Sequence, residues 1–173
     1  MRDLILEKVR DAAELLGLQR DRVMSQSLKD NITLPRPRIE LQFLPETYER
    51  TGRLLGGQKE GGGLLKVKKE LYQISMPVSA QIFATDEFWL KEFCYRLAAA
   101  LPRGFNDAAG NYVKLSSRQG EWEGQAVQRV GSAEINPLPK YGYILHLTAV
   151  WRITSDEMMK LITKFDLKVG GLK

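Results

Sequence analysis

The chain contains one cysteine and one histidine in 173 residues, and both scarcities exclude kinds of chemistry. Cys94 cannot form a disulfide within its own chain, and Cys94 with His146 cannot supply the thiolate and imidazole ligands of a zinc site. Secreted disulfide scaffolds and zinc ribbons are therefore excluded. At this length about 70% of the unfolded chain's surface is buried on folding, so a core forms without disulfides or a metal.

Long apolar runs are also absent. The chain nowhere offers ~18 consecutive apolar residues, so no helix is expected to span a bilayer. Charged residues interrupt the apolar positions of residues 1–18, unlike the apolar region of a secretory signal. The 26 Lys and Arg exceed the 21 Asp and Glu by a net charge of +5, which is spread along the chain. We expect a cytosolic protein with no membrane partner, for which an anionic partner is permitted but not required.

Helical periodicity occurs in a few segments. Apolar residues at helical spacing predict an amphipathic helix over residues 3–16, which Gly17 would end, and the polar stretch 20–29 allows a second short helix. Thr85 or Asp86 is expected to cap a helix that ends before Pro102, and Thr154 or Ser155 a last helix over about 156–165. The buried stripe predicted for the helix of residues 86–101 comprises Phe88, Leu90, Phe93, Cys94, Leu97 and Leu101.

Alternation of apolar and polar residues indicates strands between these helices. The clearest are residues 38–43, 71–83 and 141–154, and Pro77 on the outward face of the second suggests an edge strand or a bulge. Weaker patterns predict strands over 112–115 and 122–130, separated by a turn at Gln119 and Gly120. The order of elements predicts a single α+β domain, 1–173, with a mainly antiparallel sheet, helices packed on one face and a long flexible hairpin loop. Residues 1–34 would be an N-terminal helical extension, 52–69 a flexible basic loop and 166–173 a loose tail.

Residues that could carry catalysis are few. His146 lies on the polar side of a strand and Cys94 within an apolar helical stripe, so neither is expected to act on a substrate. Glu121 and Glu123 would share one face of a strand, which is also what an exposed β-face looks like. We predict a protein that is not an enzyme, with no catalytic residue, cofactor or metal. The alternative is a carboxylate hydrolase centred on this glutamate pair, which unchanged activity in a double Gln variant would exclude.

The glycine-rich segment 52–69 is the least globular part of the sequence. It lacks the Gly-Lys-Ser/Thr ending of a phosphate-binding loop. We interpret it as a mobile basic loop that orders on a partner protein or follows a nucleic-acid backbone, against the alternative of a solvated hairpin tip. Trp89 lies beside the apolar stripe of its helix, and an exposed Trp there would indicate a protein interface. The basic residues of the loop and its approach are Arg50, Arg53, Lys59, Lys66, Lys68 and Lys69.

The succession of elements over about residues 36–155 resembles the bacteriophage tail terminator (tail completion) family. The segments behind the resemblance are 38–45, the flexible excursion that follows, the strand 71–83, the helix 86–101 and the returning strand 141–154. The resemblance implies a structural protein of a phage or prophage virion tail, assembled in the cytoplasm of the bacterial host. It implies a homo-oligomeric ring, a hexamer, that caps the tail-tube protein and meets the head-tail connector or neck protein. It also implies that the basic loop faces inward, near the DNA channel. Closing a ring would also bury sheet edges that otherwise aggregate.

Two other functions stay open at this point. The N-terminal extension and the long loop depart from a minimal terminator, which leaves another head-tail joining or neck protein as an interpretation. The second is a non-specific nucleic-acid-binding domain that uses the basic glycine-rich loop. Salt-dependent DNA retention that is lost on neutralising Lys66, Lys68 and Lys69 would favour the second.

Overall fold

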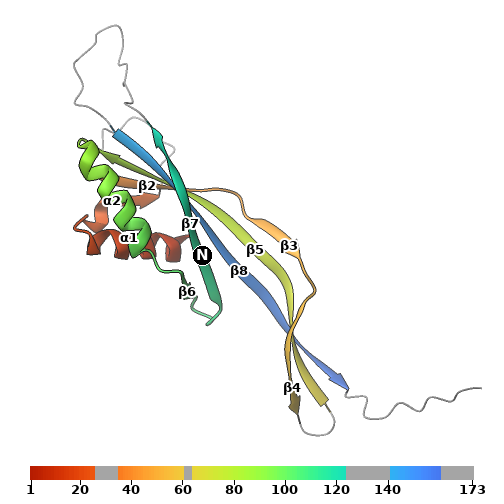
Figure 1. Ribbon diagram of the computed structural model, residues 1–173. Helices are drawn as coiled ribbons and strands as arrows, with labels where there is room; N and C mark the ends of the chain where they lie inside the picture. The colour runs from red at the N-terminus through yellow and green to blue at the C-terminus, as the bar shows by residue number, and fades with distance from the viewer. Residues whose placement is uncertain (26–34, 61–63, 124–140, 161–173) are drawn as a thin grey trace, which may run out of the picture. The chain divides into compact units, whose positions relative to one another are not determined.

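The computed structural model of the chain describes residues 1–25, 35–60, 64–123 and 141–160, and they form an α+β fold dominated by one sheet, as predicted (Figure 1). The strands are ordered β1-β2-β5-β8-β7-β6, and β3 and β4 also pair with β5. β1 and β2 are parallel, whereas β2 with β5, β4 with β5, β6 with β7 and β7 with β8 are antiparallel. The elements are α1 (Arg2–Leu15), the 3₁₀ turn η1 (Arg20–Arg22), β1 (Val23–Ser25), β2 (Arg38–Phe43), β3 (Thr47–Arg50), β4 (Leu54–Glu60), β5 (Leu64–Ala84), α2 (Glu87–Ala100), β6 (Gly104–Asn106), β7 (Tyr112–Glu123) and β8 (Tyr141–Lys160).

The chain divides into two compact units. Unit 1 consists of Met1–Thr47 and Ile74–Trp151, and unit 2 of Tyr48–Gln73 and Arg152–Lys173. The long strands β5 and β8 contribute residues to both units. The predicted tail at 166–173 lies outside the described residues.

The core of unit 1 lies between the two helices and one face of the sheet, as the sequence predicted (Figure 1). Alternate residues of each strand point to this face, and the register brings them together: Ile39 is opposite Ile82 and Leu115 opposite Ala149. The other face carries mainly polar side chains, such as Glu40 opposite Gln81, so the period of two in the sequence assigns the two faces. The strand residues of the core are Val23, Ile39, Leu41, Met76, Val78, Ala80, Ile82, Ala84, Val113, Leu115, Leu145, Leu147 and Ala149.

Within the described residues 1–25, the N-terminal segment is part of this core rather than an extension, which corrects that part of the prediction for residues 1–34. Ile5, Val9 and Ala12 of α1 are buried, and Gly17 ends the helix with a φ of 87°, a conformation that favours glycine. The short helix expected over 20–29 is replaced by η1 and β1 as far as Ser25, and the rest of that segment lies outside the described part. The reason is tertiary: Val23 gains a buried site and a strand partner, Ile39 of β2.

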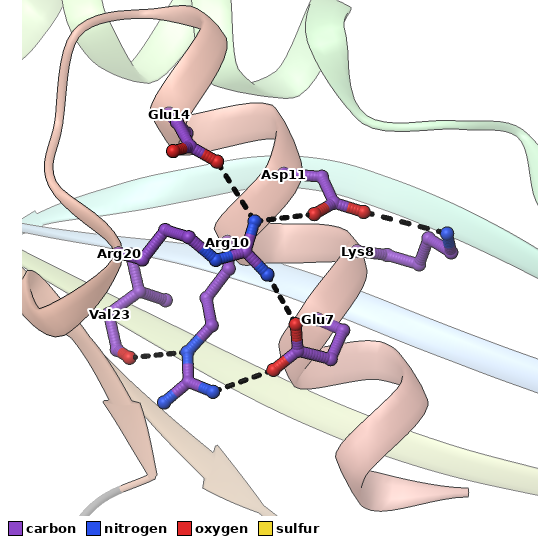
Figure 2. Close-up of polar contacts among 7 residues, drawn as sticks. All are labelled: Glu7, Lys8, Arg10, Asp11, Glu14, Arg20 and Val23. Carbon is purple, nitrogen blue, oxygen red and sulfur yellow. Dashed lines mark hydrogen bonds and ion pairs between the residues drawn. The ribbon is translucent and has the colours of Figure 1, made fainter.

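Arg20 connects η1 to α1 through a group of carboxylates on one helix face (Figure 2). The carboxylates are those of Glu7, Asp11 and Glu14, which are four and three residues apart along the helix, so without a cation they would repel one another. The hydrogen bond from Arg10 lowers the pKa of Glu7, the one from Arg20 lowers the pKa of Asp11, and the carboxylates raise the pKa of Arg20. Arg20 donates to Asp11 at 2.7 Å, to Glu14 at 2.9 Å and to Glu7.

This cluster makes stability depend on pH. Carboxyl groups whose pKa is lowered by folding stabilise the protein above their unfolded pKa, and that contribution is lost as the pH falls through the folded pKa. We therefore expect Arg20→Gln to unfold at a slightly lower temperature than the parent chain at pH 7, and the difference to shrink at about pH 3 and below. Thermal unfolding followed by circular dichroism across this range measures it. Arg96→Gln is the control, because Arg96 forms only an exposed pair with Glu92 at 3.5 Å.

α2 begins at the predicted cap. The carboxylate of Asp86 accepts hydrogen bonds from the backbone N–H groups of Phe88 at 2.8 Å and Trp89 at 3.2 Å. Leu90, Phe93, Cys94 and Leu97 are buried as expected. Phe88, however, is 85% exposed, so its place in the predicted stripe is wrong. It precedes Leu90 by two residues, which puts it about 200° away around the helix and on the opposite side.

Three predictions about the strands are also corrected. Pro77 lies in β5, which is paired on both sides. The Pro77 carbonyl accepts a hydrogen bond from the Leu44 N–H, but proline has no backbone N–H to donate in return, so β2 ends beside it. The expected turn at Gln119 and Gly120 is a register shift within the continuous strand β7. The helix expected from Asp156 is instead the end of β8 as far as Lys160.

Candidate functional site

The segment predicted to be a flexible basic loop is a hairpin. β4 pairs with the start of β5 from Glu60 opposite Leu64 to Leu54 opposite Lys69, with an irregularity between Leu54 and Gly56. Glycine suits this ladder at position 57, since a Cβ there would lie 3.3 Å from the Leu65 side chain. We call the described residues of unit 2, which are 48–60, 64–73 and 152–160, the arm.

Two of the six basic residues singled out in the sequence form ion pairs with the neighbouring strand. Lys66 lies 3.1 Å from Asp156 and Lys69 lies 3.6 Å from Glu157, both on β8. The hydrogen bond to Asp156 raises the pKa of Lys66. The acidic segment 156–157 belongs to β8, which pairs with β5, so its carboxylates lie beside lysines of β5 rather than at a helix N-terminus. The remaining four, Arg50, Arg53, Lys59 and Lys68, are exposed and form no ion pair within the described residues.

Glu70 fixes the base of the hairpin. Its side chain is only 3% exposed, and Arg152 Nε lies 3.0 Å from its Oε2. The guanidinium of Arg152 and the carboxylate of Glu70 form an ion pair, but they are not aligned as a hydrogen bond requires. The backbone of Glu70 is held as well, because its N–H donates to the Arg53 carbonyl at 2.7 Å and its carbonyl accepts from the Thr51 hydroxyl at 3.3 Å. The turn between β3 and β4 is thereby attached to β5.

Large apolar side chains are exposed along the arm. Leu54 is 62% exposed and Met158 54%, and every residue of β3 and β4 is exposed. Met158 and Met159 are consecutive in β8 and point to opposite faces, yet both are exposed. Val67 and Glu70 are buried, but elsewhere in its described part the arm leaves apolar side chains uncovered on both faces, although stable sheets bury one face against another layer. The other exposed apolar residues of the arm are Tyr48, Leu55, Tyr72, Ile153 and Met159.

Of the residues considered for catalysis, Cys94 and His146 have described side chains, and they lie on different elements, α2 and β8. Cys94 is buried, and burial raises the pKa of its thiol to about 12, so it carries no thiolate at neutral pH. His146 is exposed on β8 opposite Arg118. Glu121 and Glu123 both belong to β7, but their side chains lie outside the described part. Within the described residues, no three His, Cys, Asp or Glu side chains are grouped to hold a metal.

The tryptophan expected to be exposed is partly buried. Trp89 packs against the core and stacks on Phe93, with ring centroids 4.5 Å apart and an angle of 14° between the rings. The four-residue spacing of this pair places Trp89 at the margin of the buried stripe. The exposed aromatic residues of α2 are Phe88 and Tyr95, which is 73% exposed. Their spacing of seven residues puts both on one outer face, and helical-wheel geometry would have found them.

Comparison of the sequence with known protein families finds no family that matches, and comparison with curated proteins finds no match either. Among the residues that the structure describes, no helix is both long and apolar enough to cross a membrane.

Proposed function

We propose that the chain is a non-enzymatic assembly protein that forms a ring of identical subunits through its arm. The observation that carries the proposal is the arm itself, whose strands expose leucine, methionine and tyrosine side chains on both faces. Apolar patches of this kind mark interaction surfaces. The two cross-strand ion pairs and the fixed hairpin base keep the arm extended as a strand, so little ordering free energy opposes its docking.

A second copy of the chain is the partner that we favour. The arm carries exposed groups of both signs, such as Lys59 and Lys68 with Glu49 and Glu60, and a mixed surface can complement a copy of itself. Soluble oligomers are mostly homo-oligomers, and an arm that docks on a different surface of the next subunit produces a ring when the rotation closes. The resemblance to tail terminators makes this ring a hexamer that caps a phage tail tube and meets the neck protein in the virion.

Solution mass and particle shape test the proposal. Multi-angle light scattering at tens of micromolar is expected to give six times the 19.7 kDa of one chain, with annular particles in negative-stain images. Addition of the ring to isolated tail tubes should cap one tube end. Genes for tube, sheath or tape-measure proteins beside this one would support the tail assignment. A strictly monomeric chain that leaves tubes unchanged would refute it.

Nucleic-acid binding is the second candidate, supported by the exposed cations of the arm. Lys59 and Lys68 form no ion pair within the described residues and are free to approach phosphates. DNA retention by a monomer, with a salt dependence that weakens in Lys59→Gln with Lys68→Gln, would favour this function. Arg96→Gln, which removes an exposed cation of α2, is the matched control. Rings that do not retain DNA would favour the first proposal.

A further inference from the structure

A groove in unit 1 lies between the end of α2 and β7. Its volume is about 440 Å³. The half-buried Leu101 lines the groove, the buried Leu115 and Leu147 lie at its floor, and the exposed Arg103 and Lys114 supply positive charge. No aspartate or glutamate lines the groove. These residues belong to a single unit of the chain and lie apart in sequence from the arm.

The groove coincides with an open strand edge. β6 pairs with β7 only from Asn106 opposite Tyr112 to Gly104 opposite Lys114, and the Leu115 N–H then donates to the Arg103 carbonyl at 2.9 Å. Backbone groups alternate in direction along a strand, so the N–H and C=O of Ser117 point to the same side as those of Leu115. In the described part of the chain, no strand pairs with β7 on that side beyond Leu115.

An open edge, cations and an apolar floor together define a ligand. A strand added at an edge gains backbone hydrogen bonds, while its alternate side chains enter neighbouring pockets. Here those side chains would lie near Leu101 and near the basic groups Arg103 and Lys114, beside which no aspartate or glutamate lines the groove in the described part of the chain. Phosphate of a nucleic acid would satisfy the cations but neither the strand edge nor the apolar floor.

We propose that this groove binds an extended, acidic segment of a partner protein as an additional strand on β7. The segment pairs with the backbone of Ser117, and its carboxylates face Arg103 and Lys114. Binding here does not depend on ring formation by the arm. The two proposals are therefore tested separately.

Fluorescence anisotropy with a labelled eight-residue peptide of alternating glutamate and valine tests the site. We expect saturable binding that weakens at least about tenfold in Arg103→Glu with Lys114→Glu, because attraction becomes repulsion. Ser117→Pro removes the edge N–H but leaves the β8 side of the ladder, and it is expected to weaken binding by about tenfold. Two control variants should bind the peptide like the parent chain. Arg96→Glu changes an exposed residue of α2 outside the groove, and Ser117→Ala keeps the backbone N–H.

The peptide backbone provides a measurement that needs no folded variant. Two versions of this peptide are made, one with its odd-numbered and one with its even-numbered backbone nitrogens methylated. Only one of these two sets of N–H groups can donate to the edge of β7, so the version that lacks that set should bind about tenfold more weakly. A lysine-valine peptide should not bind. Absence of binding by the glutamate peptide would overturn the proposal. Binding that responds to charge but not to methylation or Ser117→Pro would also overturn it, as would tighter binding of a single-stranded oligonucleotide to the same cations.

Discussion

The double substitution Leu54→Asp with Met158→Asp is expected to convert the assembled protein into monomers. Both side chains are exposed in the single chain, so the change leaves the fold of the subunit intact. In an assembly that covers the arm, each aspartate would be buried without a partner, at a cost of several kcal/mol per carboxylate. Two such penalties in every subunit contact exceed what an interface of ordinary size tolerates. Light scattering gives the mass, and circular dichroism confirms that the secondary structure is kept.

Leu15→Asp is the matched control for the arm variant. Leu15 is 80% exposed at the end of α1, so the substitution changes the surface by the same chemistry outside the arm. We expect this variant to keep the mass of the parent assembly. An unchanged mass in the double arm variant would show that the arm is not the subunit contact.

Gly120→Ala is expected to destabilise the chain by about 3 kcal/mol. A Cβ at this position would lie 1.8 Å from the Ile144 carbonyl oxygen and 2.6 Å from the Tyr143 ring. The oxygen belongs to the backbone of the paired strand β8, so it cannot move aside without breaking the ladder. The Gly120 N–H also donates to the Tyr143 hydroxyl at 3.2 Å, and this contact holds the ring over the glycine. Urea unfolding of both proteins measures the difference.

Gly56→Ala is the control for this close approach. Nothing lies within 4 Å of a Cβ built at Gly56, and its φ is not in the left-handed region. Alanine there should leave stability unchanged or raise it by up to about 1 kcal/mol, because the unfolded chain loses freedom. Equal stability of the two alanine variants would contradict the tight packing of Gly120 against β8.

The sequence predicts the elements whose patterns are local. β2, β5 and β8 alternate apolar and polar residues, and the cap and buried stripe of α2 are adjacent in the chain, so the class of fold follows from them. Where long-range pairing decides, the sequence misleads. Asp156 and Glu157 follow Ser155 as they would at a helix start, yet the pairing of β8 with β5 places them in a strand, beside lysines of β5. Gln119 and Gly120 are residue types typical of a turn, but in the structure they lie at a register shift within β7.

The candidate site shows the same limit. Its six basic residues could be named from the sequence because lysine and arginine near glycines are visible in one segment. Which of them form ion pairs could not be predicted, because the partners of Lys66 and Lys69 lie on a strand nearly a hundred residues later in the chain. The exposure of Leu54 and Met158 was equally hidden, because an alternating strand sequence does not tell whether a second layer covers it.

The solitary thiol offers an experimental advantage. Cys94 lies on the buried face of α2, so an aromatic disulfide reagent reaches it only when that helix lifts from the core. With a pKa of about 12 it also reacts negligibly while it stays covered. The rate of thiol modification in the native buffer therefore counts opening events of unit 1 directly. The effect of each substitution on the opening of unit 1 can be compared in this way without denaturant and without an engineered cysteine.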